Sequence, residues 1–156
     1  VAEDYPNDLP AVDVAGYIAR EKAEVYKSMI TEEDLVITAD TVVVVDNEVL
    51  GKPVDTNDAR RMLHLISGRK HQVVTGVCLL TSTDYHSFSV TTDVTFKQLS
   101  DEEINYYIEH FKPFDKAGAY GIQEWIGYVG VTSINGSYFN VMGLPVQRIW
   151  EEVHKL

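Results

Sequence analysis

The run LVITADTVVVV at residues 35–45 constrains the fold of this chain more than any other stretch. It is apolar and β-branched at nearly every position, which is typical of a strand covered on both faces by other elements. A sheet that is covered by layers on both sides predicts a fold of the α/β or the mixed α+β class. Asp40 interrupts the run, and a carboxylate in an apolar strand is costly unless it has a partner. Asp40 is therefore the first candidate functional residue.

A short hairpin follows this strand and ends on a lysine. Asp46-Asn47 favours a tight turn toward residues 48–50. Lys52 comes next and lies between a glycine and a proline. A lysine fixed in a loop in this way can neutralise a bound anion. We interpret Asp40 and Lys52 as facing one anionic, metal-bound substrate.

Helices and hairpins alternate along the rest of the chain. Helical spacing and capping residues predict helices from Val12 to about Met29, between Asp55 or Thr56 and Gly68, from Ser100 to Phe111, and from Pro145 to Val153. Alternation predicts strands at about residues 71–81, 87–96, 131–134 and 138–141, with Asn135-Gly136 as the turn of the last hairpin. The interleaving predicts a mixed sheet in a single domain over residues 1–156.

Composition bears on the partners of the chain. Its 156 residues include 24 acidic and 13 basic side chains, a formal charge of -11. Because non-specific nucleic-acid binding depends on Lys and Arg contacts to phosphate, we expect no stable nucleic-acid partner. No apolar run approaches the roughly 18 residues of a membrane span, so we expect no membrane partner. The one cysteine, Cys78, excludes an internal disulfide and is compatible with a reducing cytoplasm.

Two further stretches combine glycines with charged side chains. Residues 67–72 contain Arg69, and residues 115–123 contain Lys116. Small residues let backbone amides approach a ligand, and Arg or Lys then neutralises its charge. Asp40 can hold Mg²⁺ or take a proton from water, so together these are the parts of a phosphoanhydride hydrolase. The sequence contains neither a Walker A string nor a GxGxxG dinucleotide loop.

Structural interpretations of the same residues stay open at this point. Asp40 can be a structural acid bonded to backbone amides. Arg69 can complement the C-terminus of the preceding helix, and Lys116 can be a solvated surface residue. Glu3 lies in an acidic loop near the N-terminus, which is typical of a solvated surface.

Five strings of this sequence resemble the motifs of the Maf family, in the order of that family. They are ADTVV (39–43), GKP (51–53), SGRKHQVVTG (67–76), DKAGAYGIQ (115–123) and INGSYFNVMGLP (134–145). The resemblance covers essentially the whole chain. It implies an elongated mixed α/β fold of the inosine-triphosphatase type, with a cleft between two lobes and frequently a homodimer.

The Maf family consists of nucleoside triphosphate pyrophosphatases that were once described as septum-formation inhibitors. The resemblance implies cleavage between the α and β phosphates with a divalent cation, Mg²⁺ or Mn²⁺. The products are the monophosphate and pyrophosphate, and the implied role is cleaning of the cytoplasmic nucleotide pool. Two other hypotheses stay open: a non-catalytic regulator that binds a cell-division partner, and a pyrophosphatase for a different base.

The resemblance also assigns roles to residues of this chain. Asp40 matches the catalytic acid of the family, either as proton acceptor or mainly as a metal ligand, and Glu3 resembles an acid that faces the metal. Lys52 matches a phosphate-facing lysine. Thr41 and Gln123 match positions tied to substrate choice, and Gln123 resembles the branch acting on dTTP and UTP. An amide both donates and accepts hydrogen bonds, which suits a uracil or thymine ring. The predicted site comprises Asp40 as catalytic residue, Thr41, Lys52, Arg69, Lys116 and Gln123 as substrate-binding residues, and Asp40 and Glu3 as metal ligands.

One family motif has no counterpart in the sequence. Family members begin with a Ser-x-Ser-Pro-Arg-Arg-like turn from a strand to a helix, which grips the triphosphate. No such string occurs here, and Val1 falls after its expected place. We therefore expect this chain to lack that strand, helix and arginine contact, and to have weak activity if no such segment is supplied.

Overall fold

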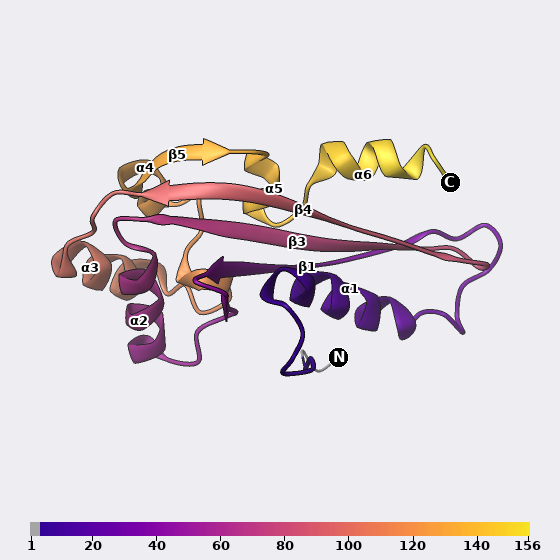
Figure 1. Cartoon of the computed structure of the whole chain (residues 1–156), viewed down its shortest axis with the longest axis horizontal. Helices are drawn as coiled ribbons and strands as arrows, with labels where there is room; N and C mark the ends of the chain where they lie inside the picture. Colours follow the sequence, from indigo (N-terminus) through magenta and orange to yellow (C-terminus); the bar gives the residue numbers. More distant parts are fainter. Residues whose placement is uncertain (1–3) are drawn as a thin grey trace.

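The structure, a computed structural model, describes residues 4–156. Within them, five strands form one sheet in the order β2-β1-β3-β4-β5. The strands are β1 (Val36–Val45), β2 (Glu48–Leu50), β3 (Lys70–Leu80), β4 (Tyr85–Phe96) and β5 (Val131–Asn135). Figure 1 shows β1, β3 and β4 running along the long axis of an elongated molecule.

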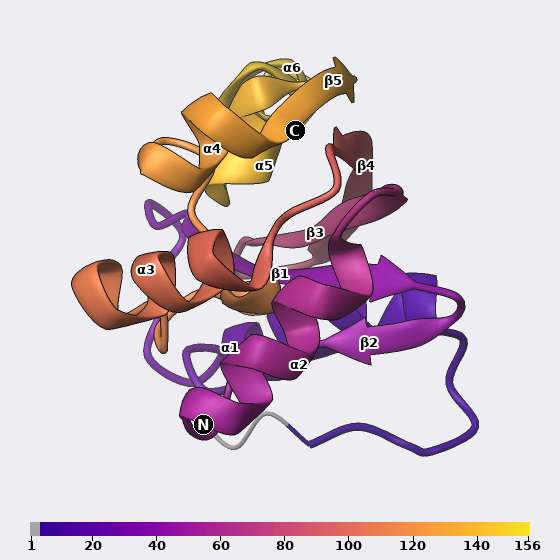
Figure 2. The same cartoon turned by 90° about the vertical axis from the view of Figure 1, so that its left-hand side faces the viewer.

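Helices cover both faces of this sheet. They are α1 (Val14–Glu24), α2 (Thr56–Ile66), α3 (Asp101–Phe111), α4 (Trp125–Gly130), α5 (Tyr138–Met142) and α6 (Val146–Val153), with the 3-10 helices η1 (Ala11–Asp13) and η2 (Ala117–Ala119). Figure 2 shows α1 on one side of the long strands and α5 and α6 on the other. None of the helices in residues 4–156 is long and apolar enough to cross a membrane.

Alternating residues of β3 account for the two covered faces. Val74 packs with Val14 and Ile18 of α1, whereas Val77 packs with Ile149 of α6. Successive side chains of a strand point to opposite faces, so the sheet has a core on each side. The α+β fold class predicted from the apolar run is therefore confirmed.

Two glycines let α1 lie very close to the sheet. A Cβ atom on Gly76 would lie 2.3 Å from the backbone nitrogen of Gly16, which is far inside van der Waals contact. Gly76 is also the register partner of Asp40 on the neighbouring strand β1. The close approach of α1 to β3 therefore occurs beside Asp40.

Local signals in the sequence correctly predict several elements. Asp46 and Asn47 have φ values of 49° and 63°, the left-handed pair that a type I′ hairpin turn requires. Asp55 caps α2, and Ser100 forms the predicted capping box of α3. In each case a short-range hydrogen bond or turn decides the conformation, which a local pattern can predict.

Two predictions about the sheet are wrong. Residues 138–141 form α5 and not a strand, because the Ser137 hydroxyl accepts a hydrogen bond from the Asn140 N–H (3.1 Å) and caps a helix. Gly143, at φ 118°, ends that helix in the left-handed region. In addition, each strand pair in the described part of the chain is antiparallel, where a mixed sheet was expected.

Two helical segments also differ from expectation. α1 ends at Glu24, and a series of turns replaces the remainder of the helix predicted to about Met29. The glycine-rich stretch after Asp115 contains the short helix α4, which the sequence pattern did not predict.

Candidate functional site

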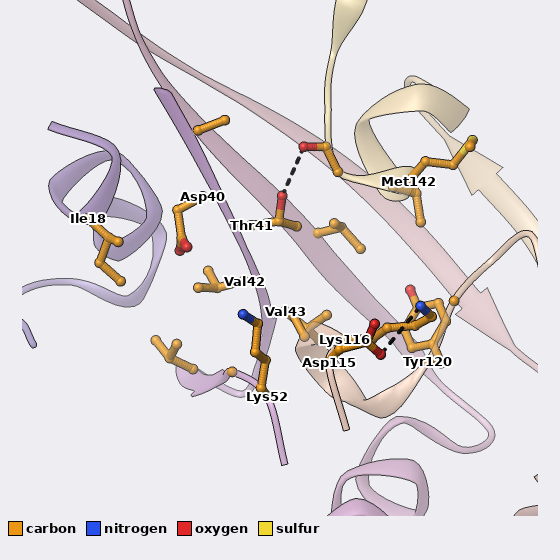
Figure 3. Close-up of a pocket in the computed structure, with 18 of the residues that line it drawn as sticks. Ile18, Asp40, Thr41, Val42, Val43, Lys52, Asp115, Lys116, Tyr120 and Met142 are labelled. Atoms are coloured by element: carbon orange, nitrogen blue, oxygen red, sulfur yellow. Dashed lines mark hydrogen bonds and ion pairs between the residues drawn. The ribbon is translucent and has the colours of Figure 1, made fainter. Parts of the chain in front are cut away.

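A cavity of about 380 Å³ collects most of the predicted site residues (Figure 3). Of the predicted residues, those that line it are Asp40, Thr41, Lys52, Lys116 and Gln123. These residues come from β1, the loop after β2, and the loop before α4. Arg69 is not among the lining residues, and Glu3 lies outside the residues that the structure describes.

The cavity reaches both faces of β1 at an edge of the sheet. β2 pairs with β1 only through Val43 to Val45, so residues 39–42 have no strand on that side in the described part of the chain. Asp40 points to the α1 face and Thr41 to the α5 face, because neighbouring strand residues alternate. Figure 3 shows the two side chains leaving β1 in these different directions. One ligand at this edge can therefore contact both.

Asp40 has the partner that an acid in an apolar strand requires. Its side chain is 11% exposed, and Lys22 of α1 donates a hydrogen bond from Nζ to Asp40 Oδ1 at 3.1 Å. The same ammonium lies 3.3 Å from the carbonyl oxygen of Ala39. The pair is partly buried, since the Lys22 side chain is 30% exposed, and the lysine gives the less exposed carboxylate a charged partner.

Lys22 is a site residue that our sequence analysis missed. It follows the buried Ile18 by four residues, and residues at that spacing share a helix face. Both residues line the cavity, so the spacing from Ile18 was the signal that could have identified Lys22.

The Thr41 hydroxyl belongs to a polar cluster on the α5 face. It lies 2.8 Å from the Thr75 hydroxyl and 3.4 Å from the carbonyl oxygen of Gly143, the contact drawn in Figure 3. Thr75 is fully buried and does not line the cavity. Thr41 therefore links the cavity wall formed by β1 to the end of α5.

Lys52 and Lys116 add positive charge at the other side of the cavity. Figure 3 shows the Lys52 side chain extending toward Asp40 from its loop. The Gly118 N–H donates to the carbonyl oxygen of Gly51 at 3.1 Å and holds the η2 segment against this loop. Lys116 Nζ lies 3.5 Å from the exposed carboxylate of Asp115, which leaves its ammonium at the cavity rim.

Arg69 has a structural partner away from the cavity. Its Nη2 donates to Asp46 Oδ1 at 2.6 Å, at the tip of the hairpin between β1 and β2. This hydrogen bond holds the pKa of Asp46 below its usual value. The structure therefore does not bring Arg69 together with the other predicted residues that line the cavity, and its role as a substrate contact stays a prediction.

A buried histidine supports one wall of the cavity. Tyr120 lines the cavity, and its hydroxyl lies 2.6 Å from His71 Nε2. His71 is 2% exposed, and burial lowers its pKa to about 4. The imidazole is therefore neutral at physiological pH, and it acts on the site through Tyr120.

We expect His71 to make the protein less stable in mild acid. The unfolded chain binds a proton at this residue below about pH 6.5, whereas the folded chain does so only near pH 4, so stability is lost as the pH falls between these values. Between about pH 7 and about pH 4.5 the loss should be about 2 kcal/mol smaller in His71→Gln than in the wild type. Urea unfolding of both proteins at both pH values measures this difference, and equal losses would contradict the assignment.

Comparison with known proteins adds to this geometry. A family model described as "Maf-like protein" matches residues 1–156. A dTTP/UTP pyrophosphatase of Phocaeicola vulgatus is 57% identical over 156 residues, which is 100% of this chain and 81% of that protein. Proteins of the same name from Bacteroides fragilis and Parabacteroides distasonis are 54% and 52% identical, over 100% and 98% of this chain and 81% and 79% of theirs.

Proposed function

The chain belongs to the Maf family, and from that premise we propose that it hydrolyses dTTP and UTP to the nucleoside monophosphate and pyrophosphate. The observation that carries the proposal is the shared cavity: Asp40, held by Lys22, lies in the same space as Lys52 and Gln123. A carboxylate, two ammonium groups and an amide are the groups that a triphosphate with a pyrimidine base requires. The relatives with this name match essentially the whole chain, which supports the same activity.

The lysines of the cavity provide the electrostatic part of catalysis. Lys22, Lys52 and Lys116 come from three different segments and would surround the phosphates with positive charge. Charge builds up on the leaving pyrophosphate as the bond between the α and β phosphates breaks, and fixed cations stabilise it.

Asp40 is the group in this cavity that is positioned to accept a proton. As the oxygen of water bonds to phosphorus and the bridging bond breaks, Asp40 takes one proton of that water. The proton later passes to solvent. Lys22 orients the carboxylate toward the cavity and keeps it from being an isolated buried charge.

We also propose that the activity needs a divalent cation, Mg²⁺ or Mn²⁺. The described residues contain no group of three or more acidic, histidine or cysteine side chains arranged so that they could hold a metal ion. Mg²⁺ commonly uses one or two carboxylates together with substrate phosphates and water, so Asp40 alone fits such a site. Bound there, the cation would neutralise phosphate charge. The assignment of Glu3 as a second ligand stays a prediction outside the described residues.

We propose that base selection depends on Thr41 and Gln123, which both line the cavity. The Gln123 side chain is exposed and has no hydrogen bond that would compete with a ligand in the described structure. Its amide can donate to a carbonyl of uracil or thymine and accept from the ring N–H. Cytosine has the reversed pattern at its ring N3 and exocyclic N4, so an amide that is held in the orientation suited to uracil binds cytosine less well.

The cellular location, the partners and the oligomeric state of the protein are also part of the proposal. We propose a cytoplasmic enzyme without stable nucleic-acid or membrane partners, acting on free nucleotides. A homodimer remains part of the proposal, and exposed apolar side chains such as Phe139 (56%) and Trp150 (70%) would suit an interface. Nothing in residues 4–156 favours the non-catalytic regulator over the enzyme.

A specificity assay tests the proposed function. With Mg²⁺ or Mn²⁺ present, we expect kcat/KM for dTTP and UTP to exceed that for CTP and ITP by about 10- to 100-fold. Gln123→Ala should reduce this ratio while leaving some hydrolysis of every nucleotide. Release of pyrophosphate and monophosphate measures all the rates. A highest kcat/KM for CTP or ITP would contradict the role of Gln123, and no release from any nucleotide would contradict the function.

A further inference from the structure

The cavity wall that carries Lys116, Tyr120 and Gln123 is not part of the sheet. It runs from Lys116 through the 3-10 helix η2 and Tyr120 to the turn at residues 121–124, and we call this turn the base loop. Irregular backbone of this kind is positioned only by the contacts it makes. The contact that fixes the base loop therefore also fixes Gln123.

One buried hydroxyl joins the two ends of the base loop. Tyr107 of α3 is fully buried, and its hydroxyl accepts a hydrogen bond from the Gly121 N–H at 3.0 Å. The same hydroxyl donates to Glu124 Oε1 at 2.6 Å. The Glu124 N–H also donates to the Gly121 carbonyl oxygen at 3.0 Å. Gln123 therefore lies inside a turn that is closed both by this backbone hydrogen bond and by the bridge through the Tyr107 hydroxyl. Burial, together with the bond to Glu124, raises the pKa of Tyr107, so the hydroxyl keeps its proton.

The Lys116 side chain packs against the same turn, and its ammonium lies 3.5 Å from the carboxylate of Asp115. A Cβ atom on Gly121 would lie 2.7 Å from Lys116 Cε and 2.8 Å from Glu124 Oε1. The lysine side chain thus packs directly over the turn that Tyr107 holds. The tyrosine ring is itself fixed by stacking on Phe111, with ring centres 5.2 Å apart.

We propose that Tyr107 is a positioning residue that sets the place of the Gln123 amide and so the selectivity for the pyrimidine base. This inference rests on the proposed function. Tyr107 does not line the cavity and acts only through the base loop. Asp40, Lys22 and Lys52 belong to other segments of the wall, so loss of the hydroxyl should affect binding of the base more than bond cleavage.

Tyr107→Phe tests the proposal because it removes one oxygen atom and keeps the ring. It leaves the Gly121 N–H and the Glu124 carboxylate without their shared partner, and such loss of a buried partner loosens the turn. We expect KM for dTTP to rise about 10-fold and the preference for dTTP over CTP to fall by a similar factor, with kcat within about 2-fold.

Three further variants separate positioning from general damage. Tyr106→Phe changes the neighbouring tyrosine, which is 45% exposed, and should leave both parameters unchanged. Glu124→Gln keeps an oxygen that accepts the Tyr107 hydrogen bond and should keep most of the selectivity. Glu124→Ala should reproduce part of the Tyr107→Phe effect, because it removes the carboxylate contact and leaves the Gly121 bond to Tyr107 in place. Adding it to Tyr107→Phe should change little further, because the contact that it removes is already lost there.

The outcomes distinguish this inference from the proposed function. Unchanged selectivity in Tyr107→Phe, or a kcat loss with unchanged KM, would overturn the positioning role while wild-type dTTP hydrolysis stands. If Tyr107→Phe fails to fold, the Glu124→Ala and Glu124→Gln pair decides in the same way. An inactive wild-type protein would instead overturn the proposed function.

Discussion

Asp40→Asn is expected to lower kcat for dTTP hydrolysis by about 10²- to 10⁴-fold, the range that a positioned proton acceptor contributes. Asparagine has nearly the same size and can still accept a hydrogen bond from Lys22, which donates at 3.1 Å in the wild type. It cannot take a proton from water, and it binds a divalent cation weakly. Steady-state kinetics with dTTP and either cation, together with circular dichroism of the variant, measure the effect.

Asp93→Asn is the matched control for this variant. Asp93 is also a strand acid with a lysine partner, because Lys70 Nζ lies 3.9 Å from its carboxylate, but it does not line the cavity. Its substitution should change kcat by less than about 2-fold. If Asp40→Asn kept more than about a tenth of the wild-type kcat, Asp40 would not be the proton acceptor.

Asn140→Ala is expected to lower the free energy of unfolding by about 3 kcal/mol, the largest stability effect that we predict. Asn140 is fully buried between α5 and the sheet. Its Nδ2 donates to the carbonyl oxygens of Val73 (3.2 Å) and Val90 (3.0 Å) and contacts the Thr92 hydroxyl (3.0 Å). Alanine leaves these acceptors without their donor and opens a cavity. Urea unfolding measures the change.

Activity should fall together with stability in this variant. The backbone oxygen of Asn140 also lies 3.4 Å from the Thr75 hydroxyl, which contacts Thr41 in the cavity. Without the hydrogen bonds of the Asn140 side chain, Met142 and Gly143 would be free to move, and both line the cavity.

Asn135→Ala, at an exposed position of β5, is the control for the stability effect and should change the free energy of unfolding by less than about 0.5 kcal/mol. A change below about 1 kcal/mol for Asn140→Ala would show that α5 does not depend on this side chain.

The strand that carries Asp40 could be predicted because its signal is local and strong. Nearly every residue from 36 to 45 favours a buried strand, so an acid among them needed a special partner. That partner could not be identified in the same way. Lys22 lies 18 positions earlier on a helix, and the packing of that helix on the sheet, including the close contact of Gly16 with Gly76, brings it over Asp40.

The segment at residues 138–141 shows where local pattern fails. Asn135-Gly136 is a strong hairpin signal, and the apolar residues after it fit a returning strand. The structure forms α5 there because Ser137 caps the helix and the Asn140 side chain also satisfies acceptors on β3 and β4, a contact between segments about 50 to 70 positions apart. Tertiary hydrogen bonds of this kind override a short turn signal.

The position of Arg69 outside the cavity could not be predicted for a similar reason. A glycine and basic residues at the end of a helix are typical of an anion contact, but equally of a hairpin partner. Which of these two roles Arg69 takes depends on where the hairpin turn places Asp46. The turn places the Asp46 carboxylate 2.6 Å from Arg69. The string at residues 67–72 contains Arg69, but it does not show that Asp46, from another part of the chain, binds the guanidinium.

The products of dTTP hydrolysis test the central claim most directly. Phosphorus NMR of dTTP with the full-length protein and Mg²⁺ or Mn²⁺ follows each phosphate group during turnover. The account predicts dTMP and pyrophosphate in equal amounts, with their formation abolished in Asp40→Asn. Formation of dTDP and inorganic phosphate, or no turnover of dTTP and UTP, would contradict it.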